Sequence, residues 1–233
     1  MLYPISNTCT VLGKVIQKPT LSFSFLCYYL KGEKNILIDT VPERCAEKLI
    51  EELKSFDAIQ NLDALILNHS EDDHSGGLGA LLSEIPNLPI YCTEACKLRL
   101  IHQYPQANFI CLPHSSQLTI GDFDFSFYHT PGLHWDDNMV TYYHNERILF
   151  SNDLFGQSYG AEPPLDEEAS ADAVFQGLNI YFDKVFKPAT PEEKAIITSL
   201  IKLDIDCVAP GHGVVLQTTL ESAFNFYKEC CAV

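Results

Sequence analysis

The sequence of 233 residues is poor in basic residues. It has 15 Lys and Arg against 31 Asp and Glu, a formal net charge of −16. Such a surface repels phosphate backbones and anionic lipids, so we expect no nucleic acid and no membrane partner. No apolar run approaches the ~18 residues of a transmembrane helix. Residues 1–10 lack a basic segment followed by an apolar core, so we expect no signal peptide and a cytoplasmic location.

Cysteines are present, but no Cys-x-x-Cys pair occurs among the nine. Their number is odd, and several lie in strand-like apolar runs. This pattern is typical of reduced thiols in a cytosol, where most act as small buried hydrophobic residues.

What the chain does contain is enough apolar sequence for a large core, with 46% hydrophobic residues and 20% charged. Strand-like and helix-like segments alternate, which predicts an α/β fold with helices layered on sheets. No linker-like stretch interrupts residues 1–233, so we expect a single domain. The clearest elements are strands at 8–17, 21–30, 35–40, 62–67, 123–129, 139–144, 147–151 and 207–209, and helices at 42–56, 74–84, 93–102, 171–186 and 191–203, with a last helix from about 219. The segment 155–170 is predicted to be a long loop, a candidate lid beside a site.

The chemistry concentrates at His69-Ser70-Glu71-Asp72-Asp73-His74, directly after the apolar strand at 62–67. In an extended segment, alternate residues point to one side, so His69, Glu71 and Asp73 are predicted to face one cavity. His74 opens the next helix and can turn in from the other side. This arrangement favours two metal ions over one.

Three further polar residues follow predicted strands: His134, Asp153 and His212. Loops after strands are where α/β sheets place their sites. Each residue alone is compatible with ordinary turn chemistry. Together with the first motif they predict one metal site.

Several segments, in order, carry a resemblance to a known family. They are YYLKGEKNILIDTVPE, ALILNHSEDDHSGGLGALL, IYCTEA, LHWDDNMVTY, ILFSNDLFGQ and PGHG. The sequence resembles the metallo-β-lactamase superfamily and, more narrowly, the diiron domain of flavodiiron proteins, which implies an αββα sandwich. Hydrolytic zinc members usually have His where this chain has Glu71, and a carboxylate there favours iron over zinc.

The resemblance implies a ligand set. His69, Glu71 and His134 would bind one iron, Asp73, His74 and His212 the second, and Asp153 would bridge them together with an oxo or hydroxo group, as in the relatives. His74 is the least secure ligand, because its counterpart is not always coordinated. Asp137 is a candidate to hold a ligand imidazole, and Trp135 is expected to form a wall of the pocket.

The same resemblance implies reaction with O2 or NO. Flavodiiron proteins carry FMN in a flavodoxin-like domain, and this chain shows no phosphate loop of that kind, so we expect no FMN in it. Two ferrous ions can take O2 to the peroxide level. The favoured interpretation is therefore an oxygen-binding or oxygen-sensing module, with a signalling partner. The alternatives are an O2 or NO reductase fed by a separate flavoprotein or rubredoxin, and a dizinc hydrolase. Resemblance also implies a homodimer.

Overall fold

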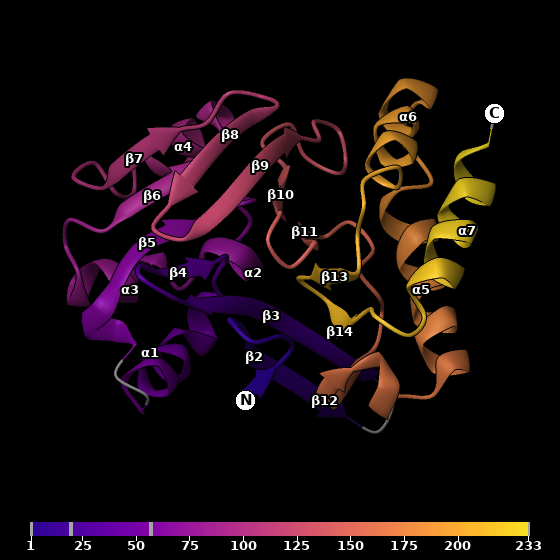
Figure 1. Ribbon diagram of the computed structural model, residues 1–233, viewed down its shortest axis with the longest axis horizontal. Helices are drawn as coiled ribbons and strands as arrows, with labels where there is room; N and C mark the ends of the chain where they lie inside the picture. Colours follow the sequence, from indigo (N-terminus) through magenta and orange to yellow (C-terminus); the bar gives the residue numbers. More distant parts are fainter. Residues whose placement is uncertain (1, 19–20, 56–57, 233) are drawn as a thin grey trace.

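The computed structural model describes residues 2–18, 21–55 and 58–232. Two β-sheets lie face to face, and helices cover the outer face of each (Figure 1). Three hydrophobic clusters fill these layers, one between the sheets and one beneath the helices on each side. This is the αββα sandwich that the sequence predicts.

The first sheet has seven strands in the order β1-β2-β3-β4-β5-β6-β7. Strands β1 to β4 pair antiparallel, whereas β4 to β7 pair parallel. The parallel strands carry helices on one face and the second sheet on the other, which explains their continuous apolar runs. The bounds are β1 Tyr3–Pro4, β2 Cys9–Lys18, β3 Leu21–Lys31, β4 Asn35–Ile38, β5 Leu62–Ile66, β6 Pro89–Cys92 and β7 Asn108–Cys111.

The second sheet has five strands in the order β13-β11-β10-β9-β8. Strand β11 pairs parallel with β13, and the other neighbours pair antiparallel. A separate pair, β12 and β14, runs parallel. The bounds are β8 Ser116–Ile120, β9 Phe123–His129, β10 Met139–Tyr143, β11 Ile148–Asn152, β12 Gly160–Leu165, β13 Cys207–Pro210 and β14 Gly213–Val215.

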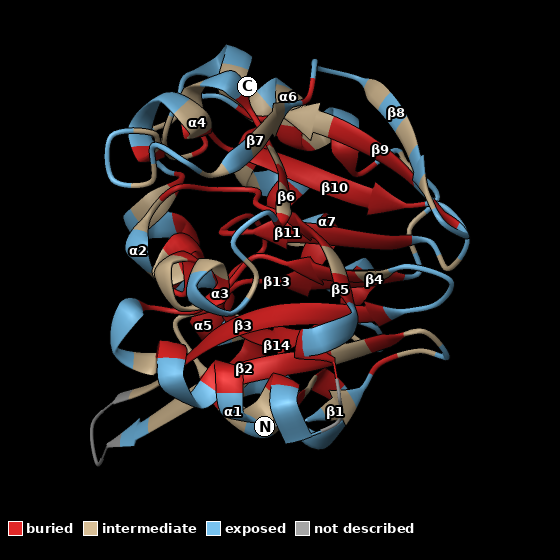
Figure 2. Cartoon of the chain, turned by 90° about the vertical axis from the view of Figure 1, so that its left-hand side faces the viewer, coloured by how far each residue is buried: buried red, intermediate tan, exposed pale blue. Residues whose placement is uncertain are grey.

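Side-chain alternation in β9 shows how the layers are held together. Phe123, Phe125 and Phe127 point into the core between the sheets and are at most 1% exposed. Tyr128, from the opposite face of the strand, packs against the cluster beneath the helices. Burying one such Phe stabilises the fold by about 1.5–3 kcal/mol. The buried strands form the centre of the molecule in Figure 2.

Helices α1, α3 and α4 pack on the first sheet, and α5, α6 and α7 pack on the second. Helix α6 begins with a capping box: the Thr190 hydroxyl accepts from the Glu193 amide, and the Glu193 carboxylate accepts from the Thr190 amide. The bounds are α1 Ala46–Ser55, α2 Asp72–Ser75, α3 Leu78–Glu84, α4 Glu94–Leu100, α5 Ala171–Val185, α6 Pro191–Leu200 and α7 Leu220–Cys231.

Two local predictions are wrong. The helix expected from His74 to Glu84 is two helices, α2 and α3, so Asp73 lies on a helical turn rather than in an extended segment. The chain turns between them at Gly76, where a Cβ atom would lie 2.3 Å from the backbone nitrogen of Glu43. The helix expected to end near Phe56 is described as far as Ser55, and Phe56 lies outside the described residues.

The second wrong prediction concerns the segment 155–170. It contains β12, which pairs with β14, and a 3-10 turn at Asp166–Glu168. The buried Asp166 carboxylate accepts from the backbone amides of Gln217 and Thr219. The segment is therefore tied to the stretch of chain that leads into α7 and is no free lid.

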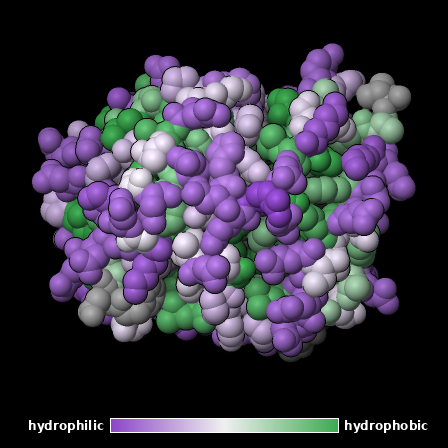
Figure 3. Space-filling view, in the orientation of Figure 1, coloured by the Kyte–Doolittle hydropathy of each residue, from purple (hydrophilic) through white to green (hydrophobic). Residues whose placement is uncertain are grey.

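The surface agrees with the composition. The face shown in Figure 3 carries mainly hydrophilic side chains, with hydrophobic residues in smaller patches between them. In the described part of the chain, no helix is both long and apolar enough to cross a membrane. All nine cysteines are free thiols, and six of them, including Cys231 near the chain end, are buried.

Candidate metal centre

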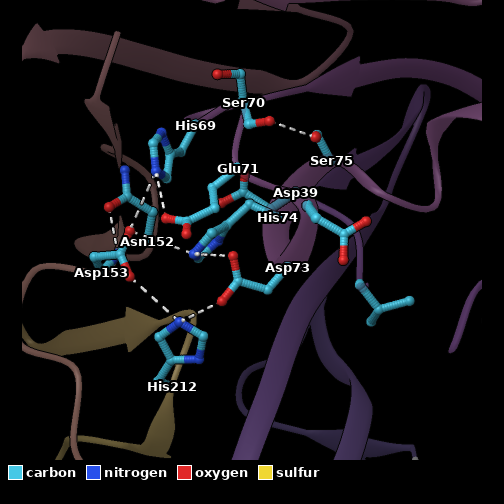
Figure 4. A network of polar contacts seen from close by, with 12 residues as sticks. Asp39, His69, Ser70, Glu71, Asp73, His74, Ser75, Asn152, Asp153 and His212 are labelled. Atoms are coloured by element: carbon cyan, nitrogen blue, oxygen red, sulfur yellow. Dashed lines mark hydrogen bonds and ion pairs between the residues drawn. The ribbon is translucent and has the colours of Figure 1, made fainter. Parts of the chain in front are cut away.

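The seven predicted ligands lie together, and Figure 4 labels all of them except His134. Each comes from a strand end or the turn after it, so the fold gathers residues that are far apart in sequence. His69 and Glu71 follow β5, Asp73 and His74 lie in α2, His134 follows β9, Asp153 follows β11, and His212 lies between β13 and β14.

Asp153 is the centre of this group, because its carboxylate faces four imidazoles. Its Oδ2 atom lies 3.4 Å from Nε2 of both His74 and His134 and 3.8 Å from Nε2 of His69. Its Oδ1 atom lies 3.3 Å from Nε2 of His212. The side chain is 3% exposed.

The other two carboxylates divide the cluster into halves. Glu71 Oε2 lies 3.3 Å from His69 Nε2 and 3.2 Å from His134 Nε2. Asp73 lies 3.4 Å from His212 Nε2 and 3.9 Å from His74 Nε2. Two sets have their ligand atoms within 4.8 Å of one another: His69, His134 and Asp153, and Asp73, His74 and His212.

A buried polar network fixes the turn that leads into His69. Asp39, which has a φ of 56°, accepts from the Asn68 amide at 2.6 Å and from the Asn68 side chain at 3.1 Å. Thr141 donates to the Asn68 side-chain oxygen at 2.7 Å. Because Asn68 immediately precedes His69, this network sets where the ligand loop begins.

Gly211, the residue before His212, lies directly against the His74 ring. A Cβ atom at Gly211 would lie 2.4 Å from the His74 ring, so a larger residue would displace that imidazole. Tyr28 donates to the Pro210 carbonyl at 2.6 Å. The Nδ1 atom of His212 lies 2.9 Å from the Ser24 carbonyl, which can only accept, so Nδ1 carries a proton and Nε2 faces the cluster.

Asp137 holds His69 in the corresponding way, as the sequence predicts. Its carboxylate lies 3.2 Å from His69 Nδ1 and accepts from the Ser70 amide at 2.8 Å. Trp135 stands edge-on to the His69 ring with centroids 4.9 Å apart, and 5.9 Å from the His134 ring. It therefore forms the predicted wall of the site.

Tyr181 and Asn152 are contacts that the sequence reasoning missed. Tyr181, in α5, donates to Asp153 Oδ1 at 2.5 Å. Asn152 has a φ of 44°, a conformation that Asn tolerates better than most residues, and donates to the Met139 carbonyl at 2.7 Å. Tyr181 lies 28 residues beyond Asp153 with no motif around it, so no sequence signal marks it; Asn152 at least adjoins a predicted ligand.

In metal-free protein, carboxylates and imidazoles of the cluster shift one another's pKa values. Burial alone would lower the pKa of His69, but hydrogen bonds to Asp137 and Glu71 outweigh it and raise the pKa to about 10. For His212, burial is likewise outweighed by Asp153 and Asp73, and the pKa rises to about 10. Hydrogen bonds from His134 and His69 lower the pKa of Glu71 to about 2. The His69 and His212 imidazoles thus hold protons where metal ions would neutralise the same carboxylates.

Several buried atoms of the cluster have no hydrogen-bond partner. Both ring nitrogens of His74, Oδ1 of Asp73 and Oδ2 of Asp153 are in this state. Buried polar atoms without hydrogen bonds are costly, and here Asp73 Oδ1 and Asp153 Oδ2 both lie within 3.9 Å of His74 Nε2. Four imidazoles and three carboxylates form a nitrogen- and oxygen-rich donor set that suits iron. The residues therefore fit a pair of metal ions.

The remaining candidates lie apart from the cluster. Asp72 and Asp136 are exposed, and their carboxylates accept from the Glu43 amide and from Arg99 respectively. His129 lies next to His114 in a separate cavity of about 700 Å³ between β9 and α6. Asp72 and Asp136 therefore lie outside the cluster.

The αββα layers and a two-centre cluster at their edge define a protein of the metallo-β-lactamase-like class. A family model described as ODP family beta lactamase matches residues 24–213. The chain belongs to this family.

The relatives carry the comparison further. The chain is 36% identical over 203 residues to an anaerobic nitric oxide reductase flavorubredoxin of Vibrio vulnificus, which covers 85% of this chain and 41% of the relative. Its fold matches the flavodiiron protein of Giardia intestinalis with a TM-score of 0.92 at 22% identity, over 99% of this chain and 59% of the other. The rubredoxin oxygen:oxidoreductase of Desulfovibrio gigas matches with a TM-score of 0.90 at 22% identity, over 98% and 61%. The predicted resemblance to flavodiiron proteins is confirmed, and the chain spans less than half of this flavorubredoxin and about three-fifths of these two structures.

Proposed function

We propose that the chain is a non-haem diiron protein. His69, Glu71 and His134 would hold one iron and Asp73, His74 and His212 the other, with Asp153 shared between them. The observation that carries this proposal is the single buried Asp153 carboxylate facing four imidazoles at 3.3–3.8 Å. A carboxylate with two oxygens aimed at two separate histidine groups suits a bridge between two cations.

We further propose that the centre binds and activates O2 as an oxygen-binding or oxygen-sensing module. Two ferrous ions, when bound, would supply the electrons for that chemistry. The chain itself supplies position: Asp137 and the Ser24 carbonyl fix the Nδ1 protons of His69 and His212, so Nε2 of both rings stays turned inward. The side chains of Glu71 and His134 are 38% and 26% exposed, so a small gas molecule can reach this half of the site from solvent.

Residues around the centre also control protons and water. The Tyr181 hydroxyl oxygen lies 2.5 Å from Asp153 Oδ1 and donates its proton to this shared carboxylate inside the core. Trp135 covers one side of His69 and limits the access of water there. A site with one protected proton and one open side suits the binding of a small diatomic molecule.

A second function is favoured by the sequence relatives. The curated relative at 36% identity is named an anaerobic nitric oxide reductase, and one similar structure is named an oxygen oxidoreductase that works with rubredoxin. This chain would then reduce NO or O2 repeatedly, with electrons from a separate flavoprotein or rubredoxin. Glu71 in place of a histidine argues against the hydrolase alternative.

The test loads anaerobic protein with Fe(II), removes the excess, and adds O2 while dissolved O2 and absorbance are recorded. We expect two irons per chain and an O2 uptake that stops after a single turnover. Asp153→Asn should lose iron, whereas His144→Ala, a histidine outside the cluster, should bind it normally. Continued uptake with a reductant and a flavoprotein would support the reductase instead, and two zinc ions with esterase activity would contradict both.

Three further statements belong to the proposal. Residues 1–233 would act as one diiron domain, its partner would be an electron-transfer or signalling protein, and the chain would form a homodimer. Sedimentation of the iron-loaded protein tests the dimer. The cytoplasmic location stays a prediction of the sequence.

A further inference from the structure

Arg99 contacts the loop that follows a metal ligand at three consecutive residues. Its guanidinium lies over the ring of Trp135, 4.8 Å from the centroid. Its Nη2 atom donates to Asp136 Oδ1 at 2.5 Å, and its Nε atom lies 3.7 Å from Asp137 Oδ1. Arg99 lies in α4, which contributes none of the seven proposed ligands.

The same helix holds this loop at its other end. Thr93, the N-cap of α4, accepts from the Cys96 amide and donates to the Asp137 carbonyl at 2.9 Å. Helix α4 therefore contacts residues 135–137 through Thr93 at its N-terminal end and Arg99 near its C-terminal end. The contact made by Thr93 is buried, whereas the contacts made by Arg99 lie at the surface, where the Arg99 side chain is 43% exposed.

Trp135 lies between Arg99 and the proposed metal site and contacts both. One face of its ring carries the Arg99 guanidinium, and its ring stands at 88° to His69 with centroids 4.9 Å apart. Trp135 also follows His134 directly in the chain, so a shift of Trp135 moves that imidazole as well. Two of the three residues of the half-site formed by His69, Glu71 and His134 thus depend on where Trp135 lies.

The electrostatics point the same way. Asp137 is fully buried, and its Oδ1 atom lies 3.2 Å from His69 Nδ1 and 3.7 Å from Arg99 Nε, so Arg99 adds a second positive group beside the carboxylate that holds His69. Asp137 in turn holds His69 Nδ1. In a chain with 31 acidic and 15 basic residues, a cation placed against two adjacent carboxylates and an aromatic face is a specific arrangement.

We propose that Arg99 is a positioning residue, which holds Trp135 and the loop 134–137 against His69 and so sets how tightly the half-site of His69, Glu71 and His134 binds its metal. The proposal rests on the proposed diiron function for its metal-binding part only. A planar guanidinium is required, because it stacks on Trp135 and pairs with Asp136 at the same time. Lysine can supply the ion pair but not the stacking.

The chain offers a matched control in Arg147. This residue also pairs with two carboxylates, Asp204 and Asp206, and its side chain is 48% exposed, but it has no contact with the site among the described residues. The variants are therefore R99Q, R99K and R147Q. Because Trp135 is the only tryptophan in the chain, its fluorescence reports on this loop alone.

Two measurements are made on each variant without oxygen. Acrylamide quenching of Trp135 fluorescence in the metal-free protein should increase in R99Q, increase less in R99K, and stay at the wild-type value in R147Q. Titration with Fe(II) against a competing chelator should show one of the two sites weakened by about 10- to 100-fold in R99Q, the range found when a residue supporting a ligand is lost. R147Q should bind iron as the wild type does.

The two measurements separate the possible failures. If wild-type protein binds no Fe(II), the proposed diiron function fails, while the quenching data still decide whether Arg99 holds Trp135. If R99Q shows wild-type quenching and wild-type iron binding, Arg99 has no positioning role. If R99Q and R147Q lose stability to urea equally and differ in neither other measurement, Arg99 is only a surface ion pair and the proposal is overturned.

Discussion

Removal of one hydroxyl group tests whether the buried cluster is organised as described. Tyr181 donates to Asp153 Oδ1 at 2.5 Å, and both side chains are buried. The Tyr181 ring packs in the cluster beneath α5, α6 and α7. Tyr181→Phe keeps this ring and removes only the hydrogen bond to the carboxylate.

The expected loss depends on whether metal is bound. A hydrogen bond to a charged group contributes about 1.5–3 kcal/mol, so the metal-free variant should lose about 2 kcal/mol. For a protein of this length, that loss lowers the Tm by about 4–8 °C. In iron-loaded protein the cations neutralise Asp153, so the drop in Tm should be smaller.

Thermal unfolding followed by circular dichroism measures both values. Tyr142→Phe is the matched control, because Tyr142 donates at 2.5 Å to the neutral Asp204 carbonyl, and its loss should be about 0.5–1.5 kcal/mol in either state. A metal-free Tyr181→Phe variant that melts with the wild type would refute the reasoning. So would a drop that is equal with and without iron.

Three further predictions concern pH, metal choice and the turn before His69. In metal-free protein, the pKa of His69 and His212 is raised to about 10, so their ion pairs stabilise the fold fully below the ordinary histidine pKa of ~6.5 and less and less as the pH rises towards 10. The pKa of Glu71 is lowered to about 2, so its contribution is lost as the pH falls from ~4.3 towards 2. Urea unfolding should therefore be hardest between about pH 5 and 6.5, and a maximum above pH 9 would contradict the ion pairs. Replacement of Glu71 by His should raise the ratio of zinc to iron in protein purified from cells, measured by elemental analysis, whereas an unchanged ratio would show that this carboxylate does not select the metal. Asp39→Ala removes the acceptor of the Asn68 backbone N–H and side-chain NH2 groups, so it should cost about 1–3 kcal/mol in urea unfolding and weaken metal binding. Intact stability would show that water replaces the carboxylate.

Local pattern was enough to predict most of the fold. The runs at 62–67 and 123–129 form β5 and β9. Both could be predicted, because a run of apolar residues and an alternation of apolar and polar residues are local patterns typical of buried and half-buried strands. The small strands β12 and β14 were missed, since they pair with each other across about 50 intervening residues and have little alternation of their own. The pairing of such short strands depends on their neighbours in space.

The metal cluster was predicted for a related reason. His69, Asp153 and His212 each follow a strand, and the ends of the strands meet at one edge of the sandwich. The reason given for Asp73 was wrong, because Asp73 reaches the cluster from a helical turn in α2. Its side chain faces the other ligands even so.

Periodicity was sufficient to predict layers of helices and sheets, and the order of motifs was sufficient to indicate the family and the proposed ligands. The groups that surround these ligands follow only from how separate elements pack. Tyr181 reaches Asp153 from α5, and Arg99 reaches Trp135 from α4. Neither contact has a spacing or a motif, since contacts between separate elements arise only when those elements pack.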